Sequence, residues 1–232
     1  MAMTEPAAPP EQQPPPDEPQ EEDSALIPAL LAIYALYLLW RGANTGFRGN
    51  ALDVARALRL RETIGGALIG VAQRALADQR SAAGRAGDEL WEHADAAARA
   101  GAEAGLQVLA EALLWTDSHT MGDPTTGDAG VVPGEAKVPT RSDPPTLLAR
   151  MVAGATENAA RLTAAGLAGW SLKIWQTRLD DRVRHAHMHL QGEVRPLGEG
   201  FETAGHKLMF PHDPSAPIEL RAGCRCWLRF RR

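Results

Sequence analysis

Cysteine and aromatic residues are scarce in this chain of 232 residues. Its two cysteines are Cys224 and Cys226, and Phe, Trp and Tyr together make up 5% of the sequence. A disulfide between residues this close in sequence would close a strained ring, so we expect no disulfide scaffold and a reduced, intracellular protein. Much of the apolar content is alanine, which favours helix but buries little area. We therefore expect long helices with thin packing in place of one large core.

The chain also lacks short motifs that mark several enzyme classes and targeting segments. It contains no serine nucleophile motif, no Gly-rich phosphate loop and no H-E-x-x-H pattern. No basic region precedes an apolar stretch at the N-terminus, so we expect no signal peptide. The candidates for a functional site are therefore the histidines and cysteines in the last quarter of the chain.

Acidic and basic residues are segregated along the chain. The net charge is −5, but residues 1–23 contain seven acids and no base, so the remaining residues carry +2. This first segment is rich in Pro, Gln and Glu, and we expect it to be a disordered acidic tail. The last twelve residues contain five arginines and no acid, and Arg229, Arg231 and Arg232 are candidates for contact with nucleic-acid phosphates. An exposed, solvated chain end is the alternative.

An uncharged segment runs from Ala25 to Trp40. Its sixteen residues fall short of the roughly 20 that usually span a membrane. Pro28 fits the first turn of a helix, where its missing N–H group is tolerated. We expect a helix that packs against other helices or a partner protein, with a short membrane anchor as the alternative.

Two helices are predicted in the region that follows, over 50–80 and 88–115. Asn50 and Asp88 are plausible N-caps, because their side-chain oxygens can accept hydrogen bonds from the first turn. In both segments apolar residues recur at helical spacing. The second carries a stripe of small residues that permits close approach, so we expect this helix to lie between neighbouring helices.

A third helix is predicted from Pro144, with Asp143 as its N-cap, to about Trp175. Nearer the C-terminus, turn residues separate short apolar runs, and we expect short strands around Lys207 to Phe210 and Cys226 to Phe230. The predicted fold class is mostly α, with long N-terminal helices and a small α+β C-terminal domain. The predicted division is a disordered tail over 1–23, a helical region over 24–117, a linker or exposed loop over 118–143, and a helix plus C-terminal domain over 144–232.

Three histidines alternate in the segment DDRVRHAHMHL. The preceding segment is predicted to be helical, and this favours a helix here as well. On a helix His185 and His189 share a face and His187 points nearly opposite, so the three do not bind one ion together. A zinc site is the alternative: Cys224 and Cys226 would join His187, or the other two histidines, as ligands. Otherwise the cysteines are small buried residues on a strand, and no cofactor is expected.

Acidic and basic residues precede these histidines. Asp180, Arg182 and Arg184 have two interpretations, of which a structural network of ion pairs is favoured over a catalytic role. His206 and His212 stand alone in loops, and we expect both to be solvated.

The order of the last sixty residues resembles a known family. The segments KIWQTRLDDRVRHAHMHLQGEV, KLMFPHDPSAP and GCRC are similar to the C-terminal domain of the phage Mu F-like minor head proteins, a head-morphogenesis family. Of the three histidines, only His187 is in register with the family pattern. Gln191 and Gly223 depart from it, since Asp and Asn are common there. The matching positions are Trp175, Asp180, Arg182, Arg184, His187, Gly192, Phe201, Pro211, Cys224 and Cys226.

The resemblance implies a structural role. Proteins of this family are carried in phage or prophage heads and associate with the portal during assembly. We therefore expect a binding protein and not an enzyme, with the portal and other head proteins as partners and several copies per particle. Its expected location is the virion head, and the host cytoplasm during assembly, without a membrane contact.

Two other functions stay open at this point. One is a metal-dependent hydrolase or nuclease that uses His187, Cys224 and Cys226, with Asp180 as a base or ligand. The other is a prophage protein anchored in a membrane through its uncharged N-terminal segment.

Overall fold

The computed structural model describes residues 22–83, 85–119, 144–180 and 183–232. The predicted acidic tail and the predicted linker over 118–143 fall almost wholly outside these residues. The described chain is mostly helical with short antiparallel strands near the C-terminus, so the predicted fold class is confirmed. The long helices and the two short helices between them are α1 (Glu22–Ala43), α2 (Ala51–Ala57), α3 (Leu60–Ala83), α4 (Arg85–Trp91), α5 (Ala94–His119) and α6 (Pro144–Leu167).

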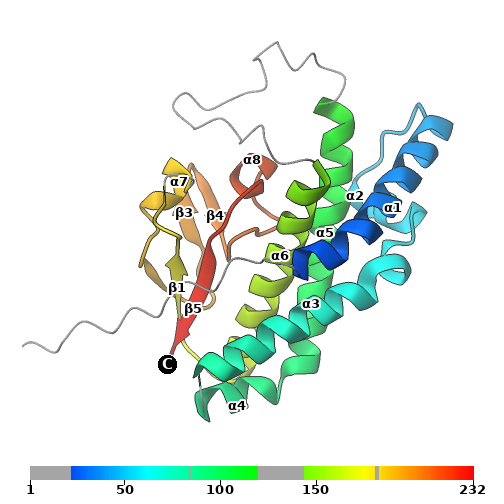
Figure 1. Ribbon diagram of the computed structural model, residues 1–232. Helices are drawn as coiled ribbons and strands as arrows, with labels where there is room; N and C mark the ends of the chain where they lie inside the picture. The colour runs from blue at the N-terminus through cyan, green and yellow to red at the C-terminus, as the bar shows by residue number, and fades with distance from the viewer. Residues whose placement is uncertain (1–21, 84, 120–143, 181–182) are drawn as a thin grey trace, which may run out of the picture.

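The C-terminal region consists of short elements that pack beside α6. Figure 1 shows the strands on one side of α6, with α1, α2 and α3 on the other. These elements are β1 (Leu172–Gln176), α7 (His185–Met188), β2 (Val194–Pro196), β3 (Phe201–Thr203), β4 (His206–Leu208), α8 (Ile218–Arg221) and β5 (Trp227–Arg231).

The helix predicted over 50–80 is divided in two. Asn50 is its N-cap as predicted, and it forms a capping box in which its side chain accepts from the backbone N–H groups of Leu52 and Asp53 while Asp53 accepts from the Asn50 N–H. The prediction of one continuous helix was wrong, because α2 ends before Arg59, whose φ of 48° is left-handed. No glycine or proline marks this break in the sequence.

The helix predicted over 88–115 is also divided. Asp88 lies inside α4 and does not cap the longer helix, which begins at Ala94. The prediction that the small-residue helix lies between neighbours is confirmed, since α5 packs against both α3 and α6. A Cβ atom added at Gly101 would lie 2.9 Å from the Cβ of Ala160 and would overlap the carbonyl oxygen of Thr156. The two helices therefore approach closely because Gly101 has no side chain.

The helix predicted to reach Trp175 ends earlier, and this prediction was wrong. Helix α6 ends at Leu167, where Gly169 adopts a φ of 70°. The N–H of Trp170 donates to the carbonyl of Ala165 at 2.9 Å and the N–H of Gly169 to that of Gly166 at 3.1 Å, which is the Schellman arrangement. The chain then turns into β1, so Trp175 lies on a strand.

A three-stranded antiparallel sheet, in the order β2-β1-β5, forms one layer of the C-terminal region. On β1 the alternate residues Lys173 and Trp175 are buried and lie opposite Phe230 and Leu228 of β5, and Thr177, just after the strand, is buried as well. The edge strand β5 is held to α6 because the N–H of Leu228 donates to Oδ1 of Asn158 at 3.2 Å. The second sheet is the β3-β4 hairpin.

Helix α1 packs one apolar face against α6 and leaves the other open. Leu30, Ile33 and Tyr37 are buried on the inner side. Within the described ranges, the stretch Leu26–Ala43 is long and apolar enough to cross a membrane by length and composition, a test that core helices and signal sequences also pass. Only 22% of that stretch is buried. We name the exposed leucines Leu31, Leu36, Leu38 and Leu39 the outer face of α1.

Candidate functional site

His187 and the two cysteines meet in the interior of the C-terminal region. His187 lies on α7, and Cys224 and Cys226 lie in the turn that leads from α8 into β5. Because α7 is helical, His185 and His189 are exposed while His187 is 1% exposed, as the helical prediction required. We call His187, Cys224 and Cys226 the His–Cys cluster.

The ligand atoms of the His–Cys cluster are close together. Nδ1 of His187 lies 3.5 Å from Sγ of Cys224 and 3.7 Å from Sγ of Cys226. The N–H of Cys226 also donates to Sγ of Cys224 at 3.5 Å. All three ligand atoms lie within 4.8 Å of one another, and both thiols are free. One imidazole nitrogen and two sulfurs therefore converge on one point.

Aromatic side chains enclose the His–Cys cluster. The ring of Trp175 meets that of His187 edge to face, with centroids 5.4 Å apart. The ring of Phe201 also meets that of Trp175 edge to face, with centroids 5.1 Å apart. Cys224 and Cys226 are 5% and 7% exposed. A substrate from solution therefore cannot reach the sulfurs without a rearrangement of the core.

The two thiols have pKa values that shift in opposite directions. The pKa of Cys224 is well below its ordinary value because Cys226 donates a hydrogen bond to it, and the imidazoles of His212 and His187 add to this effect against the opposing effect of burial. The pKa of Cys226 is well above its ordinary value, because the same hydrogen bond and burial favour its protonated form. Ionisation of the pair therefore begins at Cys224.

Charged residues hold the cluster's two segments together. Asp180 forms an ion pair with Arg225, which lies between the cysteines. Arg184 donates to the carbonyl oxygens of Leu220, at 3.4 Å, and Ala222, at the end of α8. Arg182 lies outside the described residues. The Asp180–Arg225 pair is of the kind that a structural network of ion pairs requires, whereas these contacts of Arg184 are to backbone carbonyl oxygens.

His212 corrects the sequence analysis. It was expected to be solvated, but it is 3% exposed and packs against α6, where a Cβ at Gly154 would lie 2.6 Å from its Nε2. Burial lowers the pKa of His212, and its Nδ1 atom has no hydrogen-bond partner among the described residues. His206 is exposed, as expected.

The remaining motif positions shape the backbone around the cluster. Gly192 has a φ of 75°, and its N–H donates to the carbonyl of Trp175 at 2.8 Å. Pro211 is buried beside His212 in the chain. At Gln191, one departure from the family pattern, Oε1 accepts from the N–H of Thr177 at 2.6 Å and from its hydroxyl at 2.9 Å. The Gln191 amide thus holds Thr177 by hydrogen bonds, a role that requires no carboxylate.

Lys173 is a buried residue that sequence reasoning missed. Its Nζ donates to the carbonyl oxygen of Met209 at 2.8 Å and lies 5.3 Å from the centre of the Phe201 ring. Burial lowers its pKa to about 8, although Asp213 and Glu199 act in the opposite direction. The signal was its place between two apolar neighbours on β1, at the same alternation as Trp175.

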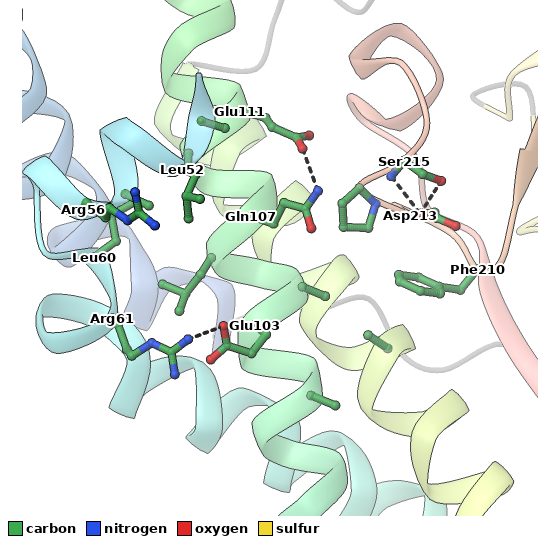
Figure 2. A pocket seen from close by; sticks show the side chains of 18 of the residues that line it. Leu52, Arg56, Leu60, Arg61, Glu103, Gln107, Glu111, Phe210, Asp213 and Ser215 are labelled. Atoms are coloured by element: carbon green, nitrogen blue, oxygen red, sulfur yellow. Dashed lines mark hydrogen bonds and ion pairs between the residues drawn. The ribbon is translucent and has the colours of Figure 1, made fainter. Parts of the chain in front are cut away.

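A groove of about 1040 Å³ lies apart from the His–Cys cluster. Figure 2 shows Glu103, Gln107 and Glu111 along α5, facing the loop that carries Phe210 and Asp213. Asp213 holds this loop by accepting from the N–H of Met209 and from the N–H and hydroxyl of Ser215. The helical wall adds arginines and leucines, among them Leu52, Arg56, Arg59, Leu60 and Arg61.

The three arginines predicted to contact nucleic acid differ in their surroundings. Arg232 forms an ion pair with Glu89 of α4 and lies 6.0 Å from the centre of the Trp170 ring. Arg229 is half-buried on β5, and Arg231 is exposed. Contact with nucleic acid stays a prediction, and Arg232 would have to leave its pair with Glu89 to take part.

Comparison with family models, curated proteins and solved structures finds no match to this chain. The resemblance to the Mu F-like head proteins therefore stays a prediction that depends on the quoted motif residues.

Proposed function

We propose that this chain is a phage or prophage minor head protein that associates with the portal and takes part in capsid assembly by binding other proteins. The packing of the motif residues carries this proposal. Trp175, His187, Phe201 and the two cysteines are far apart in sequence but form one buried group. Such packing is expected if the matching segments belong to a single domain related to the Mu F-like C-terminal domain.

The closed nature of the His–Cys cluster favours binding over catalysis. A catalytic group must touch its substrate, whereas His187 is 1% exposed behind the Trp175 ring. The groove, which is open, is lined by other residues and contains none of the cluster's three side chains. The candidate catalytic residues of the hydrolase alternative therefore do not line the open groove, where a substrate could bind.

The outer face of α1 is the surface that we propose for docking on the portal or a neighbouring subunit. Four exposed leucines lie on this helix, and Leu39 is 73% exposed. Exposed apolar side chains gathered on one helix are typical of interaction sites in soluble proteins. Docking would bury these leucines, while the inner side chains such as Ile33 already hold α1 on the bundle.

Co-purification with head particles tests the proposal. Head particles from cells that carry the encoding phage or prophage are expected to contain the chain together with the portal protein. The double variant Leu38→Glu/Leu39→Glu is expected to be absent from the particles, because docking would bury charged side chains on the outer face of α1 without a partner. A matched control is Leu167→Glu, which alters a leucine exposed to a similar degree at the end of α6.

The outcomes separate the alternatives. Absence of the folded chain from both portal and particles contradicts the proposal. The chain could instead sediment with membranes in cells that lack the portal, and lose this association in Leu38→Glu/Leu39→Glu. That result supports the membrane-anchored alternative and not the proposal.

A further inference from the structure

We propose that His187, Cys224 and Cys226 bind one Zn²⁺ ion, which fixes α7 to the turn before β5. This inference goes beyond the proposed function and does not rest on it, because a zinc ion would stabilise the C-terminal region whichever partner the chain binds.

The spacing of the ligand atoms matches a zinc site. Bonds of about 2.3 Å to sulfur and about 2.0 Å to nitrogen, at tetrahedral angles, place a sulfur and a nitrogen ligand about 3.5 Å apart. Nδ1 of His187 lies 3.5 Å from the Cys224 sulfur and 3.7 Å from the Cys226 sulfur. Both nitrogen–sulfur distances therefore match a zinc tetrahedron, and the two sulfurs lie within 4.8 Å of each other.

The donor set also selects zinc. Two thiolates and one imidazole are soft or borderline ligands that favour Zn²⁺ over Mg²⁺ or Ca²⁺. All three side chains are buried, and two thiolates this close together in the interior repel each other unless a cation lies between them. The ion would supply that charge and would deprotonate Cys226 as it binds, so binding releases protons.

His212 is the candidate for the fourth ligand. It is buried, its Nδ1 lacks a hydrogen-bond partner within the described part of the chain, and its ring interacts with Cys224. Its nitrogens lie outside the set of atoms that are within 4.8 Å of one another. Coordination therefore requires the His212 ring to move toward Cys224, which would complete a closed Cys₂His₂ site.

A zinc ion at this place has a clear physical role. The strands of the region are three to five residues long, and α7 has four residues. Short elements gain little from their own hydrogen bonds, and a metal that joins two distant segments stabilises small units of this kind. The ion would act together with the Asp180–Arg225 pair, which joins the same two segments.

Metal analysis of the full chain tests the inference. We expect about one zinc per chain after purification without chelator, or after titration with ZnCl₂. Replacement by Co²⁺ is expected to give the intense near-ultraviolet bands of thiolate-to-cobalt charge transfer. A folded chain that takes up no zinc under either condition, and whose cobalt complex lacks these bands, overturns the inference.

Matched variants assign the ligands. Cys224→Ser, Cys226→Ser and His187→Ala are expected to lose the zinc, whereas His185→Ala, which alters an exposed histidine on the same helix, is expected to keep it. Loss in His185→Ala, or retention in both cysteine variants, contradicts the assignment. Where a variant fails to fold, the cobalt spectrum of the unaltered chain still decides.

His212→Ala examines the fourth position. We expect it to weaken zinc affinity at least about tenfold, as loss of supporting groups at metal sites usually does, and to change the visible bands of the cobalt form. Unchanged affinity and an unchanged spectrum overturn the role of His212. Association with head particles is scored separately, so failure of the zinc inference does not count against the proposed function.

Discussion

Lys173 is the clearest case of a charge whose state the fold controls. Its side chain points into the C-terminal core from β1, where the carbonyl oxygen of Met209 and the Phe201 ring are its neighbours. Because burial lowers its pKa to about 8 from an ordinary value of 10.5, the folded chain binds this proton less tightly than the unfolded chain does. The unfolded state therefore holds more protons at Lys173 between these two pH values.

The pH dependence of a Lys173→Met variant follows from this shift. The free energy of unfolding of the unaltered chain should rise relative to that of the variant as the pH increases from about 8 toward 10.5. Urea unfolding of both proteins across this range measures the difference. A difference that does not change with pH would show that the folded chain leaves the Lys173 pKa unaltered.

Two histidines show what residue patterns can predict. Helical geometry predicted that His187 faces away from His185 and His189, which the structure confirms, but it did not predict which of the two faces is buried. The burial of His212 was missed, because it depends on a loop that folds back onto α6 at Gly154, far away in the sequence. Local spacing contains no sign of such a contact.

At the level of elements, the packing of α5 on α6 depends on small side chains. Gly101 faces the Thr156 carbonyl and the Ala160 methyl group, and Gly105 faces the Thr156 hydroxyl. A larger side chain at either position would force α5 and α6 apart, and these two helices pack directly against each other.

Gly101→Ala is expected to destabilise the chain by about 1–3 kcal/mol, since the added methyl group overlaps backbone that cannot move away freely. Gly66→Ala is the matched control: this glycine is exposed on α3 with nothing within 4 Å of the added Cβ. It is expected to stabilise by about 0.5–1 kcal/mol through helix propensity. Chemical denaturation compares the two, and equal effects of the same sign would contradict the close approach of α5 and α6.

Asn158 connects a helix to a sheet edge. Its Oδ1 accepts from the N–H of Leu228, and its Nδ2 donates to the carbonyl of Gly154 at 2.8 Å. Asn158→Ala would leave a buried N–H on β5 without an acceptor, so we expect a loss of about 1–3 kcal/mol by chemical denaturation. Hydrogen exchange at Leu228 should accelerate in the variant, and unchanged exchange there would argue against this tether.

Element types were easier to predict than element boundaries. The apolar spacing and the Asn50 cap identified helices because these signals are local. The end of α6 also has a local signal in Gly169, but the apolar pattern continues past it and so predicts a longer helix. The break at Arg59 has no local signal in the sequence, because it depends on how α3 packs against α5 and α6.

At the scale of the whole molecule, the fold buries the His–Cys cluster and leaves the groove open to solvent. The His–Cys cluster is enclosed within the C-terminal region, while the groove lies between α2, α3, α5 and the loop around Asp213. His187 and the two cysteines could be grouped from the sequence, because all three match one family pattern and could be ligands of one zinc ion. The groove could not be anticipated, because its walls come from segments that only the tertiary fold brings together.

Thermal unfolding of His187→Ala, beside His185→Ala as its control, tests most directly whether the His–Cys cluster is the structural centre of a binding module. Removing a buried imidazole that faces both sulfurs should cost about 1–3 kcal/mol, or roughly 2–4 °C in Tm for each kcal/mol in a chain of this size. The exposed His185 should leave Tm unchanged. If His187→Ala instead melts with the unaltered chain, the cluster does not hold the C-terminal region together.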